Sequence, residues 1–305
     1  MENDQKKSAL ETYAIPILIG FVGLGALALQ SGKTGGQTAV LNDAEYNSLE
    51  EQVVPKEGVE LPVVWGDLGK RLIASGAIDE RAFRELYAER GGLTAQEEQL
   101  LSGEGNGALV MTNENAGTIL NLFWALGLAN RNPILEDETE MMNPAYGGAG
   151  GFASTGGWTL ARGPSTGSGQ GDAMEHYNMH SLVTLTPERQ ALVEKVSKNI
   201  YRPCCGNSTH FPDCNHGMAM LGLLELMASQ GVGEDEMYKA ALAVNSYWFP
   251  DTYQTIAVYM KQKGIAWENV SPKEVLGVDY SSASGFARVA AEVAPRGGSG
   301  ASCGV

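Results

Sequence analysis

Basic residues are scarce in this chain. Among its 305 residues, 21 are Lys or Arg and 36 are Asp or Glu, which gives a formal net charge of -15 at pH 7. No stretch of the sequence gathers the basic residues into a patch. A chain of this charge repels phosphate backbones and anionic lipid head groups. The sequence therefore predicts no nucleic-acid partner.

Several catalytic motifs are also missing. The sequence has no G-x-S-x-G, no H-E-x-x-H and no Walker A loop, which removes the common signatures of serine hydrolases, zinc proteases and nucleotide-binding enzymes. The C-x-x-C pair of thiol oxidoreductases and the C-x-x-C-H site of c-type haem are absent as well. We therefore expect a binding protein more than an enzyme, although the sequence leaves the enzyme class open.

Charged residues make up only 19% of the chain, while hydrophobic residues make up 43%. This composition excludes a wholly disordered chain, and the length exceeds that of one typical domain. Apolar residues recur mostly at helical spacing, so the predicted fold class is mainly α. We expect an N-terminal transmembrane helix followed by two small helical units that a Gly-rich segment joins.

One long apolar run lies near the start of the chain. Residues 13–31 contain no charged side chain, and Lys6 and Lys7 precede them. Such a run is long enough to span a bilayer, and basic residues stay on the cytoplasmic side. The prediction is a single-pass anchor in the cell membrane, with residues 1–12 as a cytoplasmic tail and the bulk extracytoplasmic. Ala26-Leu27-Ala28 resembles a signal-peptidase site, so a cleaved signal and a secreted protein are the alternative.

Glycine content divides the remainder of the chain. We expect a tether over 32–62, a helical domain over 63–140, a Gly-rich linker over 141–172, a second helical domain over 173–294 and a flexible tail over 295–305.

Local signals predict several individual elements. Helix starts are indicated by an N-cap at Asp79, by a capping box of Thr94 with Glu97 and by Thr186 before Pro187. We also expect a helix over 65–74 and a short strand over 108–111. The apolar run over 119–128 predicts a helix enclosed by neighbours.

Cysteine and histidine cluster in one part of the predicted second domain. All four histidines of the chain and three of its four cysteines lie between positions 176 and 216; they are His176, His180, Cys204, Cys205, His210, Cys214 and His216. Thiolate and imidazole are the ligands that borderline and soft transition metals prefer. The first ligand set that we predict is Cys205, His210, Cys214 and His216. His176 and His180 are supplementary ligands, and Cys204 is a further candidate.

The expected metal is copper, with zinc next. Cys and His together with nearby Met suit copper, whereas two Cys with two His equally suit structural zinc. The predicted function is an extracytoplasmic metal-binding protein that serves as a metal carrier or an electron-transfer component. A thiol-disulfide oxidoreductase is the alternative. In a second alternative, Cys204 or Cys205 forms a disulfide with Cys214 that only stabilises a helical module, which docks on another envelope protein.

The segment around the cysteines resembles a known motif. Pro203-Cys204-Cys205-Gly206, followed by His210, Asp213-Cys214 and His216-Gly217, is similar to the motif of the PCYCGC-motif family of exported, membrane-attached bacterial proteins. The similarity covers about residues 190–240. It implies an exported binding domain that carries Cys and His, and it implies no particular activity.

Overall fold

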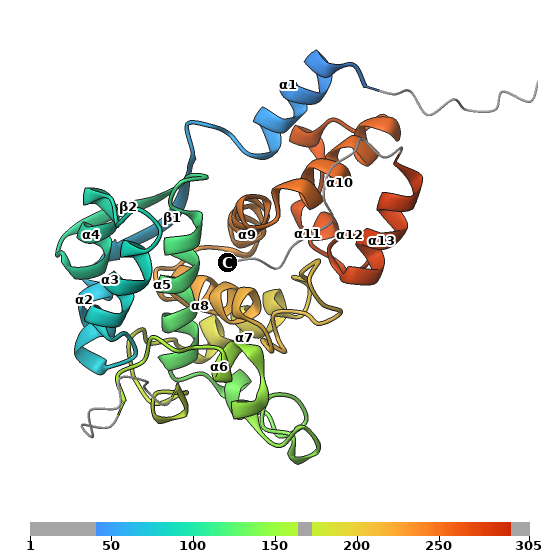
Figure 1. Ribbon diagram of the computed structural model, residues 1–305. Helices are drawn as coiled ribbons and strands as arrows, with labels where there is room; N and C mark the ends of the chain where they lie inside the picture. Colours follow the sequence, from blue (N-terminus) through green and yellow to red (C-terminus); the bar gives the residue numbers. More distant parts are fainter. Residues whose placement is uncertain (1–40, 164–172, 294–305) are drawn as a thin grey trace, which may run out of the picture. The chain divides into compact units, whose positions relative to one another are not determined.

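The structure is a computed structural model that describes residues 41–163 and 173–293. The described part of the chain is mainly helical with one small sheet, as Figure 1 shows. Its α-helices are α1 Asp43–Val53, α2 Leu68–Ser75, α3 Glu80–Ala88, α4 Ala95–Ser102, α5 Ala116–Ala129, α6 Ala153–Gly156, α7 Pro187–Ser197, α8 Asn215–Ser229, α9 Glu234–Trp248, α10 Pro250–Gln262, α11 Pro272–Val275, α12 Val278–Ser281 and α13 Ala283–Glu292. The strands are β1 Val59–Gly66 and β2 Asn106–Met111, and five short 3-10 helices lie at Pro133–Glu136, Pro144–Tyr146, Ala149–Gly151, Ala173–Glu175 and Trp267–Asn269.

The helix starts follow the local signals of the sequence. The Asp79 side chain accepts a hydrogen bond from the Ala82 N–H, and Thr94 and Glu97 form the predicted capping box. Thr186 caps α7, which has Pro187 at its first position. These side chains satisfy N–H groups that have no partner inside a helix, so their positions were predictable from the sequence.

Helices α5 and α8 form the centre of the fold (Figure 1). Almost every residue of both helices is buried, because both are apolar around most of their circumference. They pack backbone against backbone: a Cβ on Gly222 would lie 2.4 Å from Phe123 O, and one on Gly127 would lie 2.1 Å from Met218 O. The prediction of an enclosed helix over 119–128 is therefore confirmed.

This contact joins the two helical units that the sequence predicted to be separate. Helix α5 belongs to the expected domain over 63–140 and α8 to the expected domain over 173–294, yet one hydrophobic cluster contains residues of both. Residues 41–163 and 173–293 belong to one compact unit by their contacts. The expected linker over 141–172 therefore does not separate two domains. Glycine content does not reveal that two apolar helices on either side of it bury each other's surfaces.

Part of the expected linker is packed against the core. Trp158 is almost fully buried and donates its indole N–H to Ala77 O at 2.9 Å. The Trp124 indole N–H likewise donates to Ser154 O at 2.6 Å. The first contact holds Trp158 against the turn after α2, and the second holds α6 against α5. Residues 153–158 are therefore part of the core rather than a loose connection.

Strand β1 of the small sheet lies where the sequence predicted the end of a tether and the start of a helix. Strands β1 and β2 are antiparallel, and β1 alternates buried and exposed residues, with Leu61, Val63 and Trp65 turned inward. The predicted helix over 65–74 therefore begins later, at Leu68, and the expected tether over 32–62 contains α1 and the first half of β1. The predicted strand over 108–111 is confirmed as part of β2.

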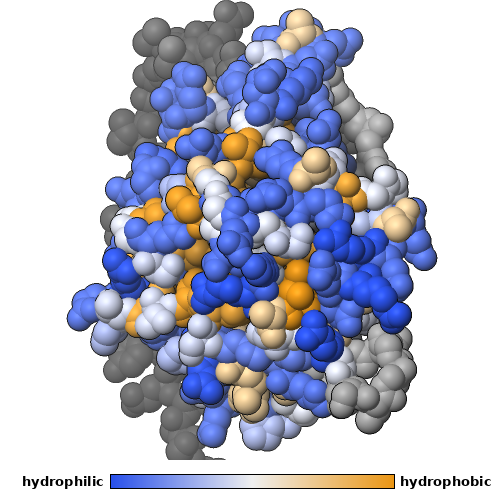
Figure 2. Space-filling view, turned by 90° about the vertical axis from the view of Figure 1, so that its left-hand side faces the viewer, coloured by the Kyte–Doolittle hydropathy of each residue, from blue (hydrophilic) through white to orange (hydrophobic). Residues whose placement is uncertain are grey.

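Short amphipathic helices cover the sheet side of the core. In α3 the buried residues are Phe83 and Tyr87, while the polar residues of this helix face solvent. Figure 2 shows this side of the molecule: hydrophilic side chains occupy most of the surface, and apolar ones appear between them. The apolar faces of these helices are therefore turned inward.

None of the helices within 41–163 and 173–293 is both long and apolar enough to cross a membrane. The predicted cytoplasmic tail over 1–12, the anchor over 13–31 and the tail over 295–305 lie outside the described residues.

Candidate metal centre

The cysteine-bearing loop between α7 and α8 folds back on itself. Tyr201 and Ser208 form an antiparallel bridge, and the Thr209 N–H donates to Ile200 O at 2.7 Å. The far end of the loop is tied to α6, because the Ser154 N–H donates to Asp213 O at 3.0 Å. The loop therefore returns Cys214 to the neighbourhood of residue 204.

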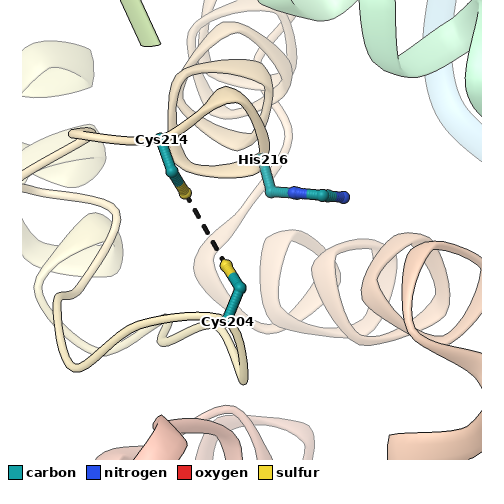
Figure 3. A group of neighbouring side chains, drawn as sticks. All are labelled: Cys204, Cys214 and His216. Atoms are coloured by element: carbon teal, nitrogen blue, oxygen red, sulfur yellow. Dashed lines mark hydrogen bonds between the residues drawn. The ribbon is translucent and has the colours of Figure 1, made fainter. Parts of the chain in front are cut away.

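Cys214 is the N-cap of α8. Its sulfur accepts a hydrogen bond from the Gly217 N–H at 3.4 Å, and it lies 3.8 Å from the sulfur of Cys204. Figure 3 shows these two side chains pointing their sulfur atoms at each other, one from the loop and one from the start of α8. Both the free N–H groups and the dipole at a helix N-terminus favour a negative sulfur at this position.

His216 adds a nitrogen donor from the first turn of α8. One ligand atom each of Cys204, Cys214 and His216 lies within 4.8 Å of the others. In Figure 3 the His216 ring projects to one side of the line between the two sulfurs. His216 is 6% exposed, and its ring packs on Phe249 with 4.4 Å between ring centroids. Burial lowers the pKa of His216 to about 4, so its imidazole is neutral near pH 7 and has a lone pair for a metal.

A second group of donors overlaps the first. One ligand atom each of Cys205, Asp213 and Cys214 also lies within 4.8 Å of the others. Asp213 forms an ion pair with Arg202 at 2.8 Å and accepts from the Asn207 amide at 2.8 Å. The carboxylate is therefore held in place at the edge of the cysteine cluster.

Arg202 is the charged residue at the centre of this arrangement. Its side chain is fully buried, and its Nη2 lies 3.2 Å from Cys205 Sγ as well as 2.8 Å from Asp213 Oδ1. Nε and Nη1 have no hydrogen-bond partner in the described part of the chain. A side chain on Gly217 would fill the same space, since its Cβ would lie 2.7 Å from Arg202 Cζ. The glycine therefore makes room for a buried positive charge beside three thiols.

The three thiols differ in acidity. Hydrogen bonds from Cys204 and Cys205, together with the Arg202 charge and the Gly217 N–H, hold the pKa of Cys214 well below its ordinary range. Hydrogen bonding to Cys205 and Cys214, together with burial, raises the pKa of Cys204. The metal-free cluster therefore carries its negative charge on Cys214, which the other two thiols stabilise.

The structure separates the predicted ligands into different places. Cys204, Cys205, Cys214 and His216 come together, whereas His210 belongs to neither donor group. His210 instead lies against the end of α7, where its Nδ1 is 3.3 Å from Ser197 Oγ and its N–H donates to Ser197 O at 3.2 Å. The short loop was expected to turn His210 inward, but these contacts direct it away.

His176 and His180 form a pair of their own. His176 Nδ1 lies 3.1 Å from His180 Nε2, and neither residue belongs to the two donor groups found among residues 41–163 and 173–293. The bridge between Asn130 and His180 holds this segment beside the end of α5 instead. The two histidines expected as supplementary ligands therefore form a separate pair that is not part of the cysteine cluster.

Arg202 and the role of Asp213 were missed by sequence reasoning. Asp213 is paired with the buried Arg202. A weak signal was present, because Arg202 immediately precedes Pro203 and the cysteines. Sequence spacing alone does not indicate that a charged side chain is buried.

Comparisons with protein-family models, with curated proteins and with solved structures found no match for this chain. The chemistry of the site is therefore the basis for inferring a function.

Proposed function

We propose that this protein binds a transition-metal ion through Cys204, Cys214 and His216. The observation that carries the proposal is the convergence of two sulfurs and one imidazole nitrogen within 4.8 Å of one another in a largely buried site. A thiolate at Cys214 and a neutral imidazole at His216 are already in the protonation states that metal binding requires. Binding then needs the loss of one further proton, from Cys204.

Copper is the metal that we favour, and zinc is the next candidate. Two thiolates and one imidazole supply three soft or borderline donors, which suit Cu(I). Zinc favours four ligands, and Cys205 and Asp213 are further donors because they share a group with Cys214. Copper bound in this way would serve a metal carrier or an electron-transfer component.

The proposal also includes the location of the protein, which its N-terminal sequence and its resemblance to a known family support. The uncharged run over 13–31 supports a membrane anchor with the metal site outside the cytoplasm. The resemblance to the PCYCGC-motif family supports the same location. An envelope protein would then be the partner that delivers or receives the metal.

Elemental analysis of protein without a histidine tag tests the metal proposal. Reconstitution with Cu(I) is expected to give about one equivalent of tightly bound metal. Cys214→Ser and His216→Gln are each expected to lose it, because each removes one donor of the group.

His210→Gln is the matched control, since His210 is a histidine of the same loop outside the donor groups. It is expected to keep the metal. Equal metal content in the Cys214→Ser variant and in the unaltered protein would contradict the proposal.

A thiol-disulfide oxidoreductase is the second candidate, and the distance of 3.8 Å between Cys204 Sγ and Cys214 Sγ favours it. The Cys214 thiolate would attack a partner's disulfide and release one partner thiolate. Cys204, after losing its proton, would then attack the Cys214 sulfur and release the second partner sulfur, which leaves a Cys204–Cys214 disulfide and a reduced partner.

Peptide mapping tests this activity. Metal-free protein treated with oxidised glutathione is expected to yield a cross-linked peptide containing Cys204 and Cys214. Recovery of Cys204 and Cys214 only as free thiols or as glutathione adducts would contradict it.

A further inference from the structure

A second set of metal donors lies outside the cysteine cluster. His176 Nδ1 and His180 Nε2 are 3.1 Å apart, and their rings stack with 5.3 Å between centroids and 21° between planes. No third Cys, His or carboxylate of the described residues completes a donor group with this pair. The described residues therefore offer two imidazole donors at this place and no third side-chain ligand.

The chain holds this pair in place through its backbone. Asn178, between the two histidines, is the one non-glycine residue with a positive φ in the described part of the chain, at 59°. Its backbone N–H donates to Leu128 O at 2.8 Å, and its side-chain oxygen accepts from the Asn132 N–H at 2.7 Å. The His180 N–H donates to Ala129 O at 2.8 Å. The turn that brings the rings together is thus fixed to the end of α5.

The tautomer of His176 is fixed as well. Its Nε2 lies 2.9 Å from the carbonyl oxygen of Arg162, so Nε2 carries the hydrogen and donates it. In the neutral ring, Nδ1 then carries the lone pair that faces His180. The Arg162 backbone is itself bound to Gly76 O at 2.8 Å, and a Cβ on Gly76 would lie 2.8 Å from His176 Cε1. A histidine that donates its other N–H to a backbone carbonyl has the orientation typical of metal ligands.

We propose that His176 and His180 form a second, independent binding site for a divalent late transition-metal ion. Two nitrogens at about 2.0 to 2.1 Å from one ion, with an angle of about 90 to 110° between them, lie roughly 3 Å apart. The observed separation of 3.1 Å meets this distance condition.

The donor set also determines which ions fit. In the metal-free protein a hydrogen bond from His180 Nε2 to His176 Nδ1 occupies the gap, and a metal ion replaces that proton after His180 changes tautomer. Imidazole suits Cu(II), Ni(II) and Zn(II), whereas Mg(II) and Ca(II) prefer oxygen donors. His180 is only partly buried, so water can complete the coordination.

Cu(II) titration of the Cys204→Ser/Cys214→Ser double variant tests the site, because this background removes the sulfur ligands of the first centre. Electron paramagnetic resonance is expected to detect about one equivalent of bound Cu(II) with nitrogen ligation. His180→Gln in that background is expected to weaken Cu(II) binding at least tenfold, and His210→Gln is expected to leave it unchanged. Equal binding by the His180→Gln and His210→Gln variants would overturn the proposal.

A measurement on the unaltered chain does not depend on how the variants fold. With one equivalent of Cu(I) already bound at the first centre, substoichiometric Cu(II) is expected to broaden the imidazole NMR signals of His176 and His180 together, while the His210 signal stays sharp. Broadening of the His210 signal to the same extent, or no broadening of the His176 and His180 signals, would contradict a site at this pair.

Discussion

At the scale of single residues, two fully buried ionisable side chains of the described residues, Arg202 and Glu225, lie beside or on α8. Arg202 packs against the first turn of α8, and its charge is balanced by Asp213 and by the negative sulfur of Cys214. Glu225 lies further along the same helix and is fully buried. A buried charge is costly unless it is paired or hydrogen-bonded, so each of these groups depends on specific neighbours.

Glu225 is expected to make stability depend on pH. Its oxygens accept from the Asn132 amide at 2.6 Å and the Asn130 amide at 3.2 Å, but burial raises its pKa well above the ordinary value. The folded protein therefore holds this proton more tightly than the unfolded chain. The stabilising contribution is complete below the unfolded pKa and is lost as the pH rises through the folded pKa.

Urea unfolding at several pH values measures this effect. The difference in free energy of unfolding between Glu225→Gln and the unaltered protein is expected to change with pH by up to about 1.4 kcal/mol per pH unit, in favour of the variant as pH rises. The exposed Glu114→Gln is the control and should run parallel to the unaltered protein. If the stability of Glu225→Gln also runs parallel to that of the unaltered protein across the pH range, the pKa of Glu225 is not raised in the folded protein.

At the scale of elements, the contact between α5 and α8 depends on two glycines that face each other. A Cβ on Gly222 would lie 2.4 Å from Phe123 O and 2.7 Å from Gly127 N. Both neighbours are backbone atoms, so they yield only if the helices move apart. Gly117 lies in α5 too, but a Cβ there meets no atom within 4 Å.

Alanine substitution should therefore have opposite effects at the two positions. Gly222→Ala is expected to lower the free energy of unfolding by about 1 to 3 kcal/mol, because it overpacks the helix contact. Gly117→Ala is expected to raise it by about 0.5 to 1 kcal/mol, because alanine favours the helix. Chemical denaturation of both variants measures these changes. An unchanged free energy of unfolding in Gly222→Ala would show that the two helices are not in backbone contact.

Local chemistry explains which elements the sequence could predict. The caps at Asp79, Thr94 and Thr186 act within four residues, so their helices were predicted with correct starts. Strand β1 was missed because its partner β2 follows only after three intervening helices. Only the tertiary fold determines that pairing.

The site was predictable in part for the same reason. Clustering of cysteine and histidine in the sequence indicated Cys204, Cys205, Cys214 and His216, which the loop brings together. The direction of His210 depends on its contact with Ser197 in α7. Such contacts between elements are not encoded in spacing.

At the scale of the whole molecule, α8 connects the candidate metal centre to the core. Its N-terminus carries Cys214 and His216, and its middle packs on α5 through Gly222. Just beyond its C-terminus, the Gln230 side chain forms two hydrogen bonds of 2.8 Å with the backbone of Val64 in β1. A metal bound at the start of this helix would therefore stabilise the whole described fold, by an amount that grows with the logarithm of its affinity.

X-ray absorption at the metal edge of the reconstituted protein tests the central claim most directly, because it counts the sulfur and nitrogen atoms around the ion. With Cu(I), the account predicts two sulfur ligands and at least one imidazole nitrogen, and Cys204→Ser should reduce the sulfur count to one. A spectrum with nitrogen and oxygen ligands but no sulfur would contradict binding at Cys204, Cys214 and His216.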